Sequence, residues 1–96
     1  MTDEQKFYVD DDPLIRIDCI NSLLGATNPK ILYQKPDGTE GSWIASIEDE
    51  YYLEYQTVED DLDQEGIWFF HASVTFGTAE KVGNLTSIEI YARFKG

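Results

Sequence analysis

The stretch IWFFHASVTF, residues 67–76, decides the fold class of this chain. From Trp68 onward every second side chain is apolar, and the positions between them include the polar His71, Ser73 and Thr75. Side chains of a β-strand point alternately to the two faces of its sheet, so a period of two predicts a strand. We expect the face that carries Trp68 to lie in the core and the face that carries His71 to lie opposite it.

The same alternation recurs on both sides of this stretch, in segments rich in Ile, Tyr, Phe, Trp and Val with turn residues between them. Strands are expected over residues 6–10, 14–20, 30–35, 41–48, 51–57, 67–76 and 86–95. Their inward rows include Trp43, Ala45 and Ile47, then Tyr51, Leu53 and Tyr55, then Ile88, Ile90, Ala92 and Phe94. Short antiparallel strands in a chain of this length predict an all-β fold, an immunoglobulin-like antiparallel β-sandwich of about seven strands.

Turn signals support this order of strands. In KPDG, residues 35–38, the proline and the aspartate suit the centre of a type I turn, and the glycine suits the left-handed position of a bulged hairpin. The acidic residues 48–50 predict a second tight reversal, and residues 58–66 a longer crossing loop. The acids and glycine before Trp68 resemble the corner before strand F of immunoglobulin-like domains, where a tyrosine takes the inward position.

Length and charge limit the organisation and the partners of the chain. We expect one domain, residues 1–96, whose residues 1–12 form either an edge strand or an extended arm. Nineteen acidic and seven basic residues give a formal net charge of −12, which repels phosphate, so nucleic acid is not expected as a partner. A membrane is not expected either, because no apolar run approaches the roughly 18 residues of a membrane span.

Residue types that support catalysis are scarce. The chain has one histidine, His71, and one cysteine, Cys19. Nucleophilic and acid-base catalysis need a nucleophile with a base, or paired acids in different environments, and no such pair is apparent. Cys19 is expected as a buried apolar thiol. We therefore predict no enzymatic activity, no catalytic residue and no cofactor.

Two acidic runs, residues 10–12 and 59–65, are rich in carboxylate oxygens of the kind that calcium prefers. Neither run has the glycine spacing of an EF-hand loop, and consecutive carboxylates do not all point at one site. We expect solvated loops and assign no metal ligand, with a structural calcium ion as the alternative.

Aromatic side chains exceed what one small core can enclose, so several are expected on the sheet surfaces. Such residues form either protein contacts or a platform for stacking sugars, and we favour protein contacts because no accompanying set of polar groups can be located. The interface residues expected are Tyr33, Tyr52, Phe69, His71 and Tyr91.

One set of turn and core motifs resembles a known family. The motifs are LLGAT (residues 23–27), ILYQKPDGT (31–39), WIA (43–45), LEYQT (53–57), DLDQEGIW (61–68) and ASV (72–74). Together they resemble a group of small structural proteins of tailed bacteriophages, over about residues 14–94. Residues 10–12 and 77–84 lie outside the shared pattern.

The resemblance implies a non-enzymatic virion component with an immunoglobulin-like sandwich, at the head surface, the head-to-tail connection or the tail. Its partners would be other virion proteins in a multi-copy assembly, and it would assemble in the cytoplasm of the bacterial host. Two alternatives stay open. The first is a carbohydrate-binding adhesion module on the virion, and the second is an acidic regulatory or inhibitory protein that mimics nucleic acid.

Overall fold

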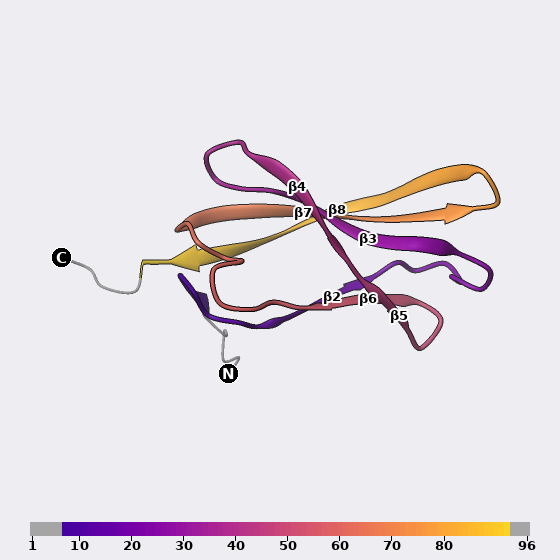
Figure 1. The fold of residues 1–96 in the computed structure, drawn as a ribbon, viewed down its shortest axis with the longest axis horizontal. Coiled ribbons are helices and arrows are strands. Elements are labelled where there is room, and N and C mark those ends of the chain that lie inside the picture. Colours follow the sequence, from indigo (N-terminus) through magenta and orange to yellow (C-terminus); the bar gives the residue numbers. More distant parts are fainter. Residues whose placement is uncertain (1–6, 93–96) are drawn as a thin grey trace.

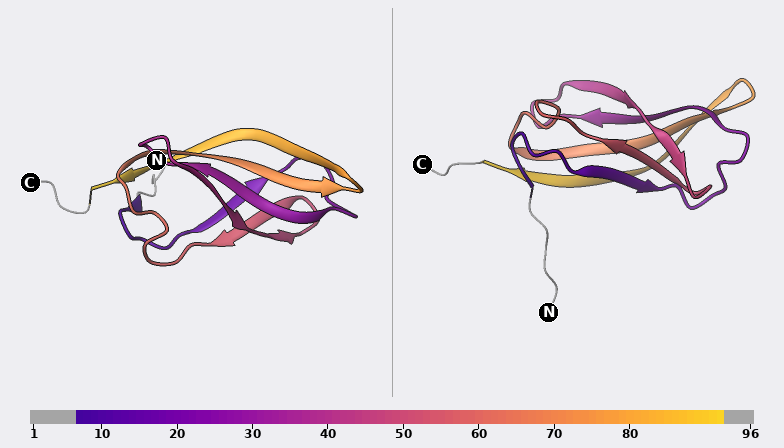
Figure 2. Two further views of the ribbon diagram at one scale, coloured as in Figure 1. Left: turned by 45° about the horizontal axis from the view of Figure 1, so that its top comes forward. Right: turned by 60° about the horizontal axis from the view of Figure 1, so that its bottom comes forward.

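A computed structural model describes residues 7–92, apart from the side chain of Asn84, and shows an all-β chain in two facing sheets (Figures 1 and 2). One sheet has five strands in the order β1-β8-β7-β3-β4, and the other has three in the order β2-β6-β5. The strands are β1 (Phe7–Tyr8), β2 (Leu14–Asp18), β3 (Thr27–Gln34), β4 (Glu40–Ile44), β5 (Ser46–Glu48), β6 (Tyr52–Gln56), β7 (Gly66–Phe76) and β8 (Ala79–Tyr91). The predicted all-β class is confirmed, and the sheets curl over each other as a sandwich-like arrangement.

Strand β7 lies in the middle of the larger sheet and pairs with β3 on one side and β8 on the other. The side chains that share the face of Trp68 are buried, including Phe70, Ala72 and Val74. The strand predicted over residues 67–76 is thus confirmed, with its core face as expected.

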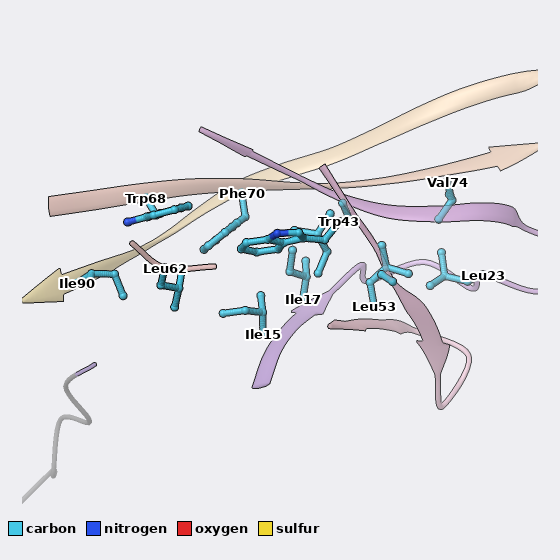
Figure 3. Close-up of a cluster of buried hydrophobic side chains, with 13 residues drawn as sticks. Ile15, Ile17, Leu23, Trp43, Leu53, Leu62, Trp68, Phe70, Val74 and Ile90 are labelled. Carbon is cyan, nitrogen blue, oxygen red and sulfur yellow. The ribbon is translucent and has the colours of Figure 1, made fainter. Parts of the chain in front are cut away.

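The core lies between the sheets and takes side chains from both (Figure 3). Trp68 and Leu53, which come from opposite sheets, have no exposed surface, and Leu62 of the crossing loop also lies fully inside. The remaining buried apolar residues are Ile15, Ile17, Leu23, Ile31, Trp43, Ala45, Phe70, Ala72, Val74 and Ile90. Burial of apolar surface from two sheets is what stabilises this two-layer arrangement.

The single strand predicted over residues 41–48 is wrong in one respect, because the structure divides it at Ala45. β4 pairs with β3 in the larger sheet, whereas β5 pairs with β6 in the smaller one. Trp43, Ala45 and Ile47 all face the core, so the alternation continues unbroken through the change of sheet. Periodicity alone therefore does not predict the change of sheet at Ala45.

The last strand begins earlier than predicted, at Ala79 instead of residue 86. It returns from β7 through a turn at Gly77, whose φ is +61°. Residues 79–83 and 85–87 are exposed, so this half of β8 lacks the apolar alternation that marks a half-buried strand. Residues 93–95 of the predicted strand lie outside the described residues.

The predicted turn at residues 35–38 is confirmed. The amide of Gly38 donates to the carbonyl of Lys35 at 2.8 Å, and the amide of Lys35 donates to the carbonyl of Thr39 at 2.7 Å. Gly38 has a φ of +93°, the left-handed position that closes a bulged hairpin. The Asp37 carboxylate accepts the Thr39 amide, and this bond lowers the pKa of Asp37.

The reversal predicted at residues 48–50 is also confirmed, with φ values of +52° at Asp49 and +67° at Glu50. The expectation that Tyr51 faces the core is wrong, because it lies in this turn and is 41% exposed. At the N-terminal end, Phe7 and Tyr8 pair in parallel with β8, so this part of residues 1–12 is an edge strand. Residues 1–6 lie outside the described part of the chain.

Candidate functional site

A hollow of about 680 Å³ lies on the larger sheet. We call the face of this sheet that points away from the three-stranded sheet the outer face. The hollow is lined by β3, β4, β7 and β8 through Leu32, Tyr33, Gln34, Glu40, Gly41, Ser42, Phe69, His71 and Leu85. Its volume exceeds that of a second hollow, of about 230 Å³, and we take it as the candidate site.

Strand register explains why these side chains meet. Ser42 pairs with Leu32, Leu32 with His71, and His71 with Leu85, so the four form one row across β4, β3, β7 and β8. Neighbouring strands lie roughly 4.8 Å apart, so the row spans about 14 Å. We call it the histidine row.

A second row runs beside the first. Glu40 pairs with Gln34, Gln34 with Phe69, and Phe69 with Ser87, which we call the phenylalanine row. Each row carries apolar side chains near its middle and polar groups at the β4 side. The exposed fraction of Phe69 is 36%, a large value for an aromatic side chain in a central strand.

The imidazole of His71 is held by the neighbouring strand. Its Nδ1 lies 2.9 Å from the main-chain carbonyl oxygen of Gly83. A carbonyl can only accept, so Nδ1 donates this bond, and Nε2 of the neutral ring is left as an acceptor. The β7–β8 pairing shifts between His71 and Ser73, which brings the Gly83 carbonyl opposite the ring. In its neutral form, His71 therefore offers one defined hydrogen-bond acceptor to a molecule in the hollow.

Tyr33 lines the hollow from the core side. Its ring centroid lies 4.7 Å from that of Trp43 and 5.8 Å from that of Trp68. A side chain at Gly41 would collide with the Tyr33 hydroxyl, so the glycine lets the ring lie against β4. Tyr33 is thus half-buried and mainly part of the aromatic core, although it is also among the residues that line the hollow.

The structure brings together three of the five predicted interface residues, namely Tyr33, Phe69 and His71. Tyr52 lies on the smaller sheet, where the Arg16 guanidinium covers its ring at 3.9 Å. Tyr91 lies at the β1 side of the larger sheet, where its ring centroid is 6.0 Å from that of Tyr8. Neither of these two lines the hollow.

Sequence reasoning missed the other lining residues, above all Leu32 and Leu85. The turn at residues 35–38 contains enough information to pair Leu32 with Ser42, because it fixes the β3–β4 register. No comparable signal pairs Leu85 with His71, since the β7–β8 pairing contains a register shift between the turn and these residues.

Cys19 lies elsewhere, in a smaller hollow of about 230 Å³ between the β2–β3 connection and the far end of β7. The prediction of a buried thiol is wrong, because Cys19 is only half-buried. Burial raises the pKa of the Cys19 thiol, with a smaller contribution from Asp18, which favours the unreactive protonated form.

Two acids of the predicted acidic runs, Asp11 and Asp61, accept hydrogen bonds from main-chain amides. The Asp11 carboxylate accepts the Tyr8 amide at 2.8 Å. The Asp61 carboxylate accepts both the Val58 amide and the Tyr55 hydroxyl, each at 2.8 Å. Over residues 7–92 no group of three or more His, Cys, Asp or Glu side chains is arranged to hold a metal ion.

No family model, curated protein or solved structure matches this chain. In the described part of the chain, no helix has the length and apolar character needed to cross a bilayer.

Proposed function

We propose that this chain is a non-enzymatic structural protein of a tailed-bacteriophage virion that works through protein contacts made by the outer face. The observation that supports the contact surface is the pair of side-by-side rows around the hollow, which expose Phe69 on β7 and Leu85 on β8 and carry polar side chains at the β4 side. Exposed apolar groups gathered in a hollow with a polar rim are typical of protein interfaces. The virion setting rests on the resemblance of the turn and core motifs.

We also propose that the fold is immunoglobulin-like. The order β2-β6-β5 corresponds to strands B-E-D, and the order β8-β7-β3-β4 to strands G-F-C-C′ of such domains. The parallel pairing of β1 with β8 fits a first strand that joins the G strand. Trp68 donates from its indole Nε1 to the Gln64 carbonyl at 2.9 Å, much as the corner tyrosine of these domains bonds to upstream main chain.

A role in binding rather than catalysis is supported by the surroundings of the two candidate nucleophile or base groups. His71 and Cys19 line different hollows, so they do not form a catalytic pair. The Nδ1 of His71 is engaged by a carbonyl instead of a carboxylate that would activate it.

Carbohydrate binding is the second candidate, because the hollow supplies a polar set beside an aromatic ring. Phe69 pairs with Gln34, and Ser42 and Glu40 line the same hollow from β4, so amide, hydroxyl and carboxylate groups are present that can bond to sugar hydroxyls. Protein contact remains the favoured proposal, because the apolar Leu32 and Leu85 occupy the centre and far side of the histidine row.

Mass spectrometry of purified phage particles, combined with chemical crosslinking, tests the proposal. We expect the chain in many copies per particle, crosslinked to another virion protein through lysines near the outer face, such as Lys30. Absence of the chain from particles would refute the virion assignment. Presence in particles with binding to a glycan panel that Phe69→Ala abolishes would favour the carbohydrate alternative.

A further inference from the structure

Strand β4 forms one edge of the five-stranded sheet. Two main-chain hydrogen bonds define how it pairs with β3: the Lys35 amide donates to the Thr39 carbonyl at 2.7 Å, and the Ala45 amide donates to the Pro29 carbonyl at 3.0 Å. In an antiparallel pair, hydrogen-bonded and non-hydrogen-bonded residue pairs alternate. The odd-numbered residues of β4, Gly41 and Trp43, therefore direct their main-chain amide and carbonyl groups to β3.

The even-numbered residues Glu40, Ser42 and Ile44 then direct their amide and carbonyl groups away from β3, toward the open edge. Among residues 7–92, β4 has a strand neighbour on one side only. The edge thus presents three residues, each with one main-chain donor and one main-chain acceptor in the plane of the sheet. An added strand can form its ladder of hydrogen bonds with these groups.

The side chains of the same three residues lie on the outer face, beside the hollow. Ser42 and Glu40 begin the histidine and phenylalanine rows, and Ile44 pairs with Lys30 in the next position along. Ile44 is 83% exposed, the largest value among the exposed large hydrophobic residues of the described chain. A strand placed beside β4 would extend both rows and cover Ile44.

We propose that β4 is a docking edge that receives an extended strand from a partner protein, with apolar side chains alternating with lysine or arginine. This inference deepens the proposed protein-contact function and rests on it. The added strand forms a ladder with Glu40, Ser42 and Ile44, and its outer-face side chains continue the hollow.

The basic character of the partner follows from charge. The chain carries a formal net charge of −12, so a second copy is repelled while a basic segment is attracted. Glu40 places a carboxylate at one end of the edge, which adds to the attraction for a basic segment. In variable-type immunoglobulin domains a further strand lies beside C′, so this architecture has room for one at the corresponding edge.

The opposite sheet offers a comparison. Strand β2 is also an edge, and the Cys19 amide donates to the Tyr51 carbonyl, so Leu14, Arg16 and Asp18 direct their main-chain groups outward. Two of these three residues are charged, a feature that protects edges from pairing. The Arg16 side chain also lies over the adjacent sheet surface, where it contacts Glu54 at 3.2 Å. β4 is the more open edge for docking.

NMR titration of the full chain with synthetic eight-residue peptides tests the inference. The probe alternates valine with lysine, and its matched control replaces every lysine with glutamate. We expect the basic peptide to shift the amide signals of Glu40, Ser42 and Ile44, and the acidic peptide to bind at least tenfold more weakly.

Ser42→Pro is the decisive variant, because it removes an amide that points to the open edge and leaves the β3 ladder intact. We expect at least tenfold weaker binding of the basic peptide to Ser42→Pro, and unchanged binding to the control Ser42→Thr, which keeps the amide. A melting temperature of Ser42→Pro within a few degrees of the parent confirms that the variant folds. If proline at this position prevents folding, the parent chain is titrated instead with an N-methylated form of the basic peptide, whose main-chain donors are blocked. We then expect this peptide to bind at least tenfold more weakly than the unmodified one.

Three results would overturn the inference. The first is binding that Ser42→Pro leaves unchanged, and the second is no binding of the basic peptide at millimolar concentration. The third is self-association of the parent chain in ultracentrifugation that Ser42→Pro abolishes, since the occupant would then be a second copy. None of these removes the virion proposal, which depends on the separate test of particle composition.

Discussion

The indole Nε1 of Trp68 donates a 2.9 Å hydrogen bond to the carbonyl oxygen of Gln64, four residues earlier in the chain. Trp68 is fully buried, so this bond connects the end of the crossing loop to the beginning of strand β7 and satisfies the buried indole N–H. The hydrogen bond therefore fixes the position of the crossing loop relative to the strand that carries Phe69 and His71.

Replacing Trp68 with phenylalanine removes this bond and leaves a cavity. We expect Trp68→Phe to lower the free energy of unfolding by about 2–4 kcal/mol, because burial volume is lost and the Gln64 carbonyl loses its donor. Urea denaturation followed by circular dichroism measures it. The neighbouring change Phe69→Leu affects an exposed side chain and should cost less than about 1 kcal/mol. Equal costs for the two variants would contradict this assignment.

Gly38 occupies a left-handed position in the hairpin turn, with a φ of +93°. We expect Gly38→Ala to destabilise the chain by about 1–2 kcal/mol, because a β-carbon is strained at this φ. Gly38→Asn should cost less, since asparagine tolerates left-handed conformations better than alanine does. Thermal denaturation of the two variants compares them, and a less stable asparagine variant would show that strain at this φ is not the cause.

Tyr55 links the core to the crossing loop, and its hydroxyl donates to the Asp61 carboxylate at 2.8 Å. Burial, with a further contribution from Asp61, raises the pKa of Tyr55 from 10.0 to about 12. Because the pKa of Tyr55 is higher in the folded state than in the unfolded state, the stabilisation that its protonated hydroxyl contributes is complete below pH 10.0. This contribution is lost as the pH rises toward 12. The difference in unfolding free energy between the parent and Tyr55→Phe should therefore shrink across this range. A constant difference from pH 9 to pH 12, measured in urea, would contradict the raised pKa.

Leu85 ends the histidine row and is 55% exposed. We expect Leu85→Asp to weaken binding to the virion partner identified by crosslinking at least tenfold, with a change in stability below about 1 kcal/mol because the side chain is exposed. Val58→Asp is the matched control, since Val58 is 57% exposed and lies in the crossing loop away from the hollow. Surface plasmon resonance measures both variants, and equal losses would argue against the hollow as the contact surface.

Much of this fold follows from local sequence patterns. The alternation along β7 indicates a strand, and the glycine of the hairpin turn indicates a left-handed backbone position. Both are local features, and the structure agrees with both. The change of sheet at Ala45 cannot be recognised from the local sequence. Trp43 and Ile47, on either side of it, both face the core, so the alternation of apolar residues is not interrupted. The early part of β8 is exposed, so it lacks the pattern that marks a strand.

The candidate site was predictable only in part for the same reason. Alternation placed Phe69 and His71 on the face opposite the core, and the structure has them there. Leu32 and Leu85 join them through the pairing of β7 with two strands distant in sequence, and one of those pairings contains a register shift. Such long-range register depends on packing of the whole sheet and not on any one segment.

Hydroxyl-radical footprinting of the free chain and of purified particles tests the central claim, that the outer face is the surface in contact with other virion proteins. We predict strong protection of Phe69 and His71 in particles, while Tyr51, which is 41% exposed in the turn of the smaller sheet, is modified at nearly the same rate in both samples. Unchanged modification of Phe69 and His71 in particles, or protection confined to Tyr51, would contradict the claim.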